Sequence, residues 1–165
     1  MPDVRVELFE HHLWANEKLL AACAQLDDTA LDAPADGAYG TIRGTLVHMF
    51  AAETRYVAAI RGEPRPDALN ENKPFPGSDT LRAFASRTAT DLIALVQSAG
   101  PNDRMHGENR GESYDLPLSI PFAQAINHGT EHRTNITTVM AARGLDAPQL
   151  DVWQYARELA TKRGS

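Results

Sequence analysis

The sequence contains a single cysteine, Cys23, among its 165 residues. One thiol cannot form an intramolecular disulfide, and it cannot supply the several thiolates of a structural zinc site. A metal site in this chain would therefore use histidine, aspartate or glutamate side chains. Cys23 stands in an apolar-rich stretch, where a small thiol is more often a buried packing residue than a reactive one.

Long apolar runs and clusters of basic residues are missing as well. No stretch approaches the roughly 20 apolar residues that span a bilayer, and the N-terminal residues lack the basic-then-apolar order of a signal peptide. The 16 lysine and arginine residues are outnumbered by 22 acidic ones, which gives a net charge of −6. An acidic chain without a basic patch is a poor partner for a phosphate backbone. We expect a cytoplasmic protein that binds neither membranes nor nucleic acid.

Aromatic residues make up only 7% of the chain, although 42% of its residues are hydrophobic. With 23% charged residues, this composition is typical of a soluble helical protein rather than a disordered one. The length is close to that of an average domain and leaves little for a second core. We therefore expect one domain over residues 1–165.

Four segments place apolar residues at helical spacing and carry the start or stop signals of helices. In the first segment the spacing begins with Val4 and Leu8. Thr41 is expected to be the N-cap of the second segment, and Ser78 or Asp79 that of the third. The long helices are expected over about Val4–Ala24, from Ile42 to Gly62, over roughly Thr80–Ala99, and from Ile120 to Gly144.

The connecting segments differ in composition. Asp27–Gly40 is rich in Asp, Ala, Pro and Gly and is predicted to be a loop, and four prolines between residues 63 and 77 indicate an extended connection. Asn102–Ser119 alternates short polar and apolar stretches, which favours a small hairpin or an ordered loop. Leu150–Lys162 can form a short terminal helix. The sequence therefore predicts an all-α four-helix bundle with a short extra C-terminal helix.

Two of the six histidines have a spacing with chemical meaning. His128 and His132 are four residues apart on a predicted helix, so their imidazoles lie one turn apart on the same face. Two imidazoles on one face can reach the same ion, but a catalytic site normally has three protein ligands. A third ligand must come from elsewhere in the chain.

His48 is our candidate for the third ligand, because it stands in a mostly apolar segment where an unpartnered histidine would be costly to bury. The alternative is that His48 is a hydrogen-bonded core residue and that the spacing of the pair is coincidental. The remaining histidines, His11, His12 and His106, are expected at the surface, with His11 or His12 as a weaker candidate ligand.

The segment from His128 to His132 also matches H-x-x-E-H, the pattern of a class of zinc peptidases whose glutamate is the general base. Such peptidases take a further acidic ligand from a distant downstream helix, whereas only 33 residues follow His132. Glu131 is also turned about 100° away from His132 on a helix. We therefore reject the peptidase interpretation.

Motifs spread along nearly the whole chain resemble the DinB/YfiT-like family of small bacterial metal-binding bundles. They are Leu13–Glu17, Thr41–Arg43 leading to Leu46–Met49, Asn127–Arg133, and Arg143–Leu145. The resemblance implies a four-helix bundle with a divalent metal, commonly nickel or zinc, on three histidines that correspond to His48, His128 and His132. It also implies a homodimer.

Members of that family with known activity transfer low-molecular-weight thiols such as bacillithiol or mycothiol, or use such a thiol in isomerisation. Others are described as DNA damage-inducible proteins or as metal-dependent hydrolases. The resemblance therefore implies S-transfer with a thiol co-substrate and a small-molecule substrate. Two alternatives stay open: hydrolysis by a metal-activated water, and a metal-binding or interaction protein without catalysis.

A metal-binding histidine usually donates its remaining N–H group to a carboxylate or a carbonyl. Several side chains of the predicted helices are candidates for this role, although most of them are expected to be surface or capping residues. Arg55 and Arg133 could bind a carboxylate of an anionic thiol co-substrate, but an arginine on a helix surface is more often only solvated. The candidates for contact with a metal-binding histidine are Asn16, Glu17, Glu53, Asn127, Glu131 and Asn135.

Overall fold

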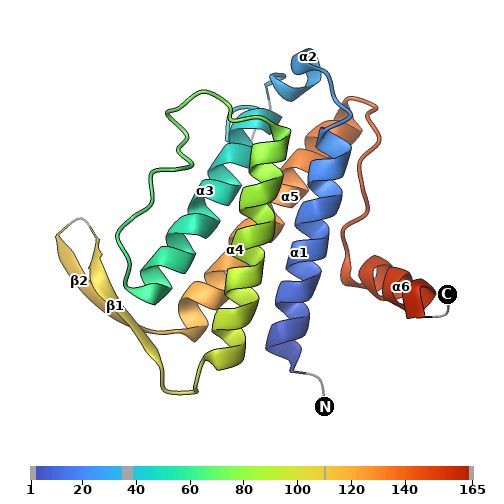
Figure 1. The fold of residues 1–165 in the computed structure, drawn as a ribbon. Coiled ribbons are helices and arrows are strands. Elements are labelled where there is room, and N and C mark those ends of the chain that lie inside the picture. The colour runs from blue at the N-terminus through green and yellow to red at the C-terminus, as the bar shows by residue number, and fades with distance from the viewer. Residues whose placement is uncertain (1–2, 35–38, 110, 164–165) are drawn as a thin grey trace.

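The computed structural model describes residues 3–34, 39–109 and 111–163. In this part of the chain, six helices and one pair of strands follow each other in the order of Figure 1. The elements are α1 (Val4–Cys23), α2 (Asp28–Leu31), α3 (Ile42–Arg61), α4 (Ser78–Ser98), β1 (Arg104–Asn109), β2 (Glu112–Pro117), α5 (Ser119–Ala142) and α6 (Val152–Arg163).

The four long helices form the bundle that the sequence predicts. Helix α1 packs against α4, α4 against α3, α3 against α5, and α5 against α1, which closes the ring of four (Figure 1). Apolar side chains from all four helices fill the interior, and Phe50 is the largest of those that are fully buried. The order of packing makes α3 and α5 direct neighbours, although their first residues, Ile42 and Ser119, are 77 positions apart in the sequence.

The start of α3 agrees with the prediction, whereas the start of α4 does not. The hydroxyl of Thr41 accepts a hydrogen bond from the Gly44 N–H at 3.0 Å, as an N-cap should. Helix α4 instead begins directly after Gly77, whose φ of 90° is accessible to glycine and costly for other residues. Neither Ser78 nor Asp79 is the cap, because the glycine turns the chain into the helix before them.

The buried face of α1 also differs from the expected one. Val4 and Leu8 are 68% and 43% exposed. The face that points into the bundle instead carries Phe9, His12 and Asn16, all of them buried. The apolar spacing misplaced this face because two of its positions are polar.

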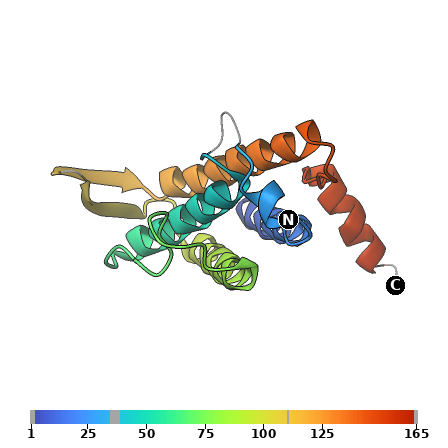
Figure 2. The same cartoon turned by 90° about the horizontal axis from the view of Figure 1, so that it is seen from above.

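The remaining elements lie outside the ring of helices. β1 and β2 form the predicted hairpin, antiparallel and with Gly107 opposite Tyr114. The hairpin and α6 project from opposite sides of the bundle (Figure 2). The short helix α2 lies in Asp27–Gly40, which was predicted to be a loop throughout; residues 35–38 of that loop are outside the described part. None of the helices in the described ranges is long and apolar enough to cross a membrane.

Candidate metal centre

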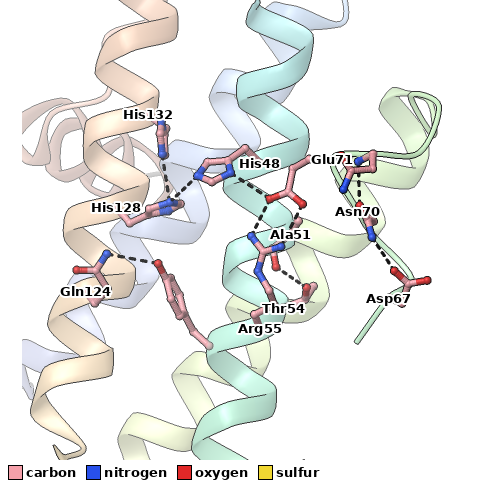
Figure 3. Close-up of polar contacts among 12 residues, drawn as sticks. His48, Ala51, Thr54, Arg55, Asp67, Asn70, Glu71, Gln124, His128 and His132 are labelled. Atoms are coloured by element: carbon pink, nitrogen blue, oxygen red, sulfur yellow. Dashed lines mark hydrogen bonds and ion pairs between the residues drawn. The ribbon is translucent and has the colours of Figure 1, made fainter. Parts of the chain in front are cut away.

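Three histidines from two helices meet between α3 and α5. His48 extends from α3, and His128 and His132 extend from α5 toward it (Figure 3). The Nε2 atom of His128 lies 3.3 Å from Nε2 of His48 and 3.1 Å from Nε2 of His132. One potential ligand nitrogen from each ring lies within 4.8 Å of the others. We call these three residues the histidine cluster.

The two helices contribute to the cluster in different ways. His128 and His132 are one turn apart on α5, so the helix itself brings their rings together, with centroids 4.4 Å apart. His48 reaches them only because α3 packs beside α5 in the ring of helices. The cluster thus combines a local spacing with one long-range contact. Such a contact is what the prediction of His48 as the third ligand requires.

The orientation of the His48 ring is set by a carboxylate that the sequence analysis missed. Glu71 lies in the connection between α3 and α4, and its Oε1 accepts the Nδ1–H of His48 at 3.1 Å (Figure 3). Arg55 donates to both carboxylate oxygens of Glu71, at 2.8 and 3.1 Å. These hydrogen bonds lower the pKa of Glu71 to about 2, so the carboxylate is ionised at neutral pH and can only accept.

The proton of a neutral His48 ring therefore belongs on Nδ1, which leaves the lone pair of Nε2 directed at the other two histidines. Tyr39 stacks on the same ring, with centroids 3.8 Å apart and planes inclined by 10°. The Tyr39 side chain is itself 53% exposed. The His48 ring is thus held along one edge and one face, and its side chain remains 18% exposed.

Tyr56, also on α3, contacts a second histidine of the cluster. Its ring meets that of His128 edge to face at a centroid distance of 5.7 Å. The amide of Gln124 donates to its hydroxyl at 3.4 Å. Two tyrosines and a glutamine amide therefore border the cluster.

The electrostatics of the cluster favour neutral imidazoles. Burial, together with the neighbouring histidines, lowers the pKa of His128 to about 4. Burial and the neighbouring His48 also lower the pKa of His132. At neutral pH both rings are therefore uncharged, which is the state that binds a metal ion.

The hydrogen bonding of the cluster cannot be completed by its own protons. Among the described residues, the buried Nδ1 atoms of His128 and His132 have no hydrogen-bond partner. Because Nε2 of His48 carries a lone pair rather than a proton, it can only accept a hydrogen bond. The N–H groups of the other two rings can then pair only some of the three converging nitrogens. A divalent cation would take all three lone pairs at once and leave each Nδ1 protonated. The residues present therefore fit a cation with three imidazole ligands.

The side chains expected to contact the metal-binding histidines have other surroundings. In the described part of the chain, none of the six candidates for contact with a metal-binding histidine hydrogen-bonds a histidine of the cluster. Glu131 is exposed, as its position on the helix predicts. Glu71 was missed because it lies in a proline-rich connection without regular spacing, which gives a sequence no signal for its direction.

A second polar cluster lies in the bundle interior and contains two of those six candidates. Its members come from all four long helices and are at most 4% exposed. We call it the buried network. Its residues are His12 and Asn16 from α1, Glu53 from α3, Thr88 from α4 and Arg133 from α5.

The hydrogen bonds of the buried network connect Arg133 to Glu53. Arg133 donates from Nη1 to Nδ1 of His12 at 3.1 Å and to the Asn16 oxygen at 2.8 Å. Since Nδ1 of His12 accepts, its proton is on Nε2, which donates to Glu53 at 2.8 Å. Asn16 also donates to Glu53, at 3.2 Å. Burial alone would raise the pKa of Glu53, but these contacts and the Arg133 charge lower it.

The close approach of α1 and α5 in this region depends on Gly129. A Cβ atom at this position would overlap the ring of His12 and come within 2.9 Å of Arg133. The glycine therefore lets the imidazole of His12 lie directly against the backbone of α5. Gly129 is also the residue after His128, so the buried network and the histidine cluster share one turn of α5.

Expectations about five single residues are corrected or confirmed here. His12 is completely buried rather than at the surface, because Glu53 of α3 and Arg133 of α5 supply polar partners. Arg133 is buried rather than solvated, because it also has polar partners in the interior. Cys23 is buried, as expected, and His106 is exposed on the hairpin. His11 is half-buried, and its Nε2–H donates to the Leu150 carbonyl at 2.8 Å.

These features define a four-helix bundle protein with a cluster of three histidines between helices α3 and α5. The chain belongs to the DinB family, whose model matches residues 1–163. It is similar to protein DinB of Bacillus subtilis (strain 168), with 22% identity over 165 aligned residues that cover 94% of this chain and 95% of that protein.

Solved structures show the same fold. YfiT from Bacillus subtilis, described as a probable metal-dependent hydrolase with an unusual four-helix bundle topology, matches with a TM-score of 0.63 at 18% identity, over 86% of this chain and 89% of YfiT. A DinB-like protein from Bacillus cereus ATCC 10987 matches with a TM-score of 0.62 at 18% identity, over 86% of this chain and 94% of that one. At these identities the likeness establishes the fold.

Proposed function

We propose that this protein is a metal-dependent enzyme that holds a divalent cation, nickel or zinc, on His48, His128 and His132. The observation that carries the proposal is the convergence of three Nε2 atoms, two of them from side chains that are only partly buried. Three protein ligands with room for a small molecule are typical of catalytic sites, whereas structural zinc sites are closed by four. The description of YfiT as a probable metal-dependent hydrolase supports the same class of function.

Within this class we propose S-transfer from a low-molecular-weight thiol to a small electrophile. When bound, the cation would favour the deprotonated, nucleophilic form of the co-substrate sulfur. The chain offers no such sulfur itself, because burial raises the pKa of Cys23 to about 12. Neutral imidazoles add no negative charge beside the sulfur, and the rings of Tyr39 and Tyr56 border the space in which the thiol and the electrophile would meet.

Hydrolysis is the second candidate, and the description of YfiT is what favours it. Attack by water usually needs a nearby general base. The carboxylate closest to the cluster in the described chain, Glu71, is already occupied by Arg55 and His48. Glu131 is exposed and contacts none of the three rings. This arrangement supports thiol transfer over hydrolysis.

Metal content tests the class of function. We expect about one equivalent of nickel or zinc in the wild type by elemental analysis, and little in His48→Ala or in the His128→Ala/His132→Ala double variant. His106→Ala is the matched control, because it removes an exposed histidine of the hairpin. Retention of metal by the cluster variants would contradict the proposal.

The reaction is tested on protein loaded with Co²⁺ or Ni²⁺, whose absorption reports on ligands. Small thiols should change the spectrum and be consumed with a fluorogenic alkylating agent, and the His48→Ala variant should do neither. Hydrolysis of an ester panel without any thiol response would support the second candidate instead. The homodimer stays part of the proposal and is tested by light scattering.

A further inference from the structure

His48 differs from the other two histidines of the cluster in having a charged side-chain partner. Its Nδ1–H donates to Glu71, whereas the Nδ1 atoms of His128 and His132 have no partner among the described residues. Glu71 is in turn held by two hydrogen bonds from Arg55. Arg55 lies seven residues after His48 on the same helix, so the carboxylate is held over the surface of α3 (Figure 3).

The geometry points to Glu71, held by Arg55, as the positioning residue that presents Nε2 of His48 to the cation and raises the affinity of the cluster for it. This inference rests on the proposed function, because it takes the histidine cluster as the metal site. Glu71 contacts no cation itself. It acts through His48, whose ring it orients and whose proton it keeps on Nδ1.

The need for a positioning residue follows from where the three ligands originate. The spacing of His128 and His132 is fixed by one turn of α5, so neither needs an external partner to face the other. His48 comes from a different helix, and its ring could present either nitrogen to the cluster. A hydrogen bond to one ring nitrogen decides which nitrogen remains for the metal, and a carboxylate acceptor also makes that nitrogen more basic.

The partial exposure of the three side chains favours this role over simple stability. The side chains of His48, Glu71 and Arg55 are 18%, 22% and 21% exposed. Ion pairs at such positions stabilise a fold by little. Holding a ligand of the cluster is a role in which the same contacts have a large effect.

The experiment compares Zn²⁺ and Co²⁺ affinities, by competition with a chelator, among four proteins: wild type, Glu71→Ala, Glu71→Gln and Glu131→Gln. We expect Glu71→Ala to bind about 10- to 100-fold more weakly. Glu71→Gln keeps an acceptor for Nδ1–H and should lose less. Glu131→Gln removes a charge next to His132 without touching a ring nitrogen, and its affinity should stay within about twofold of the wild type.

The tautomer of His48 gives a readout that needs no metal. In the metal-free wild type, nitrogen chemical shifts of the imidazole should report a proton on Nδ1, and in Glu71→Ala a mixture of tautomers or a proton on Nε2. Arg55→Leu should weaken metal binding less than Glu71→Ala does. In the Glu71→Ala background it should add little, because both changes act through one contact.

The outcomes separate this inference from the proposed function. Equal metal affinities of wild type and Glu71→Ala, with His48 still protonated on Nδ1, would overturn the role of Glu71 while leaving the metal site intact. Failure of the wild type to bind either ion would overturn the proposed function, and the imidazole shifts of the metal-free protein would still decide whether Glu71 sets the tautomer. If Glu71→Ala does not fold, Glu71→Gln and Arg55→Leu provide the same comparison.

Discussion

The bundle holds two polar clusters that contain histidine, and they use their hydrogen-bonding groups in opposite ways. In the buried network, Arg133, Glu53, His12 and Asn16 satisfy one another, and none of their buried side-chain atoms lacks a partner. In the histidine cluster, three nitrogens converge without enough protons to pair them, and two further nitrogens are left without partners in the described chain.

The difference separates the structural role of the buried network from the role proposed for the histidine cluster. A buried polar group that is fully hydrogen-bonded stabilises one arrangement of the helices, and here it ties all four long helices together. A buried group without a partner reduces stability and is retained where it has another use. Both clusters contain buried histidine, so burial alone does not identify a site; the converging lone pairs do.

Glu53→Gln is the change expected to have the largest effect on this comparison. It removes the negative charge that compensates Arg133 in the interior, and breaking such a pair costs about 3–5 kcal/mol. We expect that loss in the free energy of unfolding, measured by urea titration with circular dichroism. The same change at exposed Glu131 should stay within about 0.5 kcal/mol. A loss below about 1 kcal/mol for Glu53→Gln would show that the buried network does not have the structural role assigned to it.

Gly129→Ala tests the close packing between the two clusters. The new Cβ would overlap the His12 ring, and overpacking of this kind costs about 1–3 kcal/mol. In a His12→Ala background the overlap with the ring disappears and only the close contact with the end of the Arg133 side chain remains. The same substitution should therefore cost much less there, since alanine favours helix by about 1 kcal/mol over glycine. If thermal or urea unfolding shows that Gly129→Ala destabilises the wild type and the His12→Ala variant equally, the destabilisation does not come from overlap with His12.

The smallest expected effect is the pH dependence of the metal-free protein. The pKa of His128 is about 4 in the folded chain against 6.5 ordinarily. Between these values the unfolded chain binds more protons, so stability falls as the pH is lowered from about 6.5 to 4. His128 should contribute about 1–2 kcal/mol to this loss of stability, because solvent screens the partly exposed ring. The His128→Gln variant should show a correspondingly flatter stability profile; an unchanged profile would contradict the assigned pKa.

The predictions from the sequence succeeded where the signal is local. The four long helices, the terminal helix and the hairpin follow from spacing and from turn residues within each segment. The predictions failed where polar residues face inward, as at His12 and Arg133, because apolar periodicity counts such positions as surface. Glu71 gave no signal at all, since a residue in an irregular connection has no spacing from which its direction can be inferred.

The sequence by itself determined the pairing of His128 with His132, because one turn of helix separates them wherever the helix lies. It also determined the all-α class, through the period of its apolar residues. Only the tertiary structure decided that His48 completes the cluster, that Glu71 orients it, and that His12 belongs to the interior. Those contacts join residues from different elements, and the directions of their side chains depend on how the helices pack.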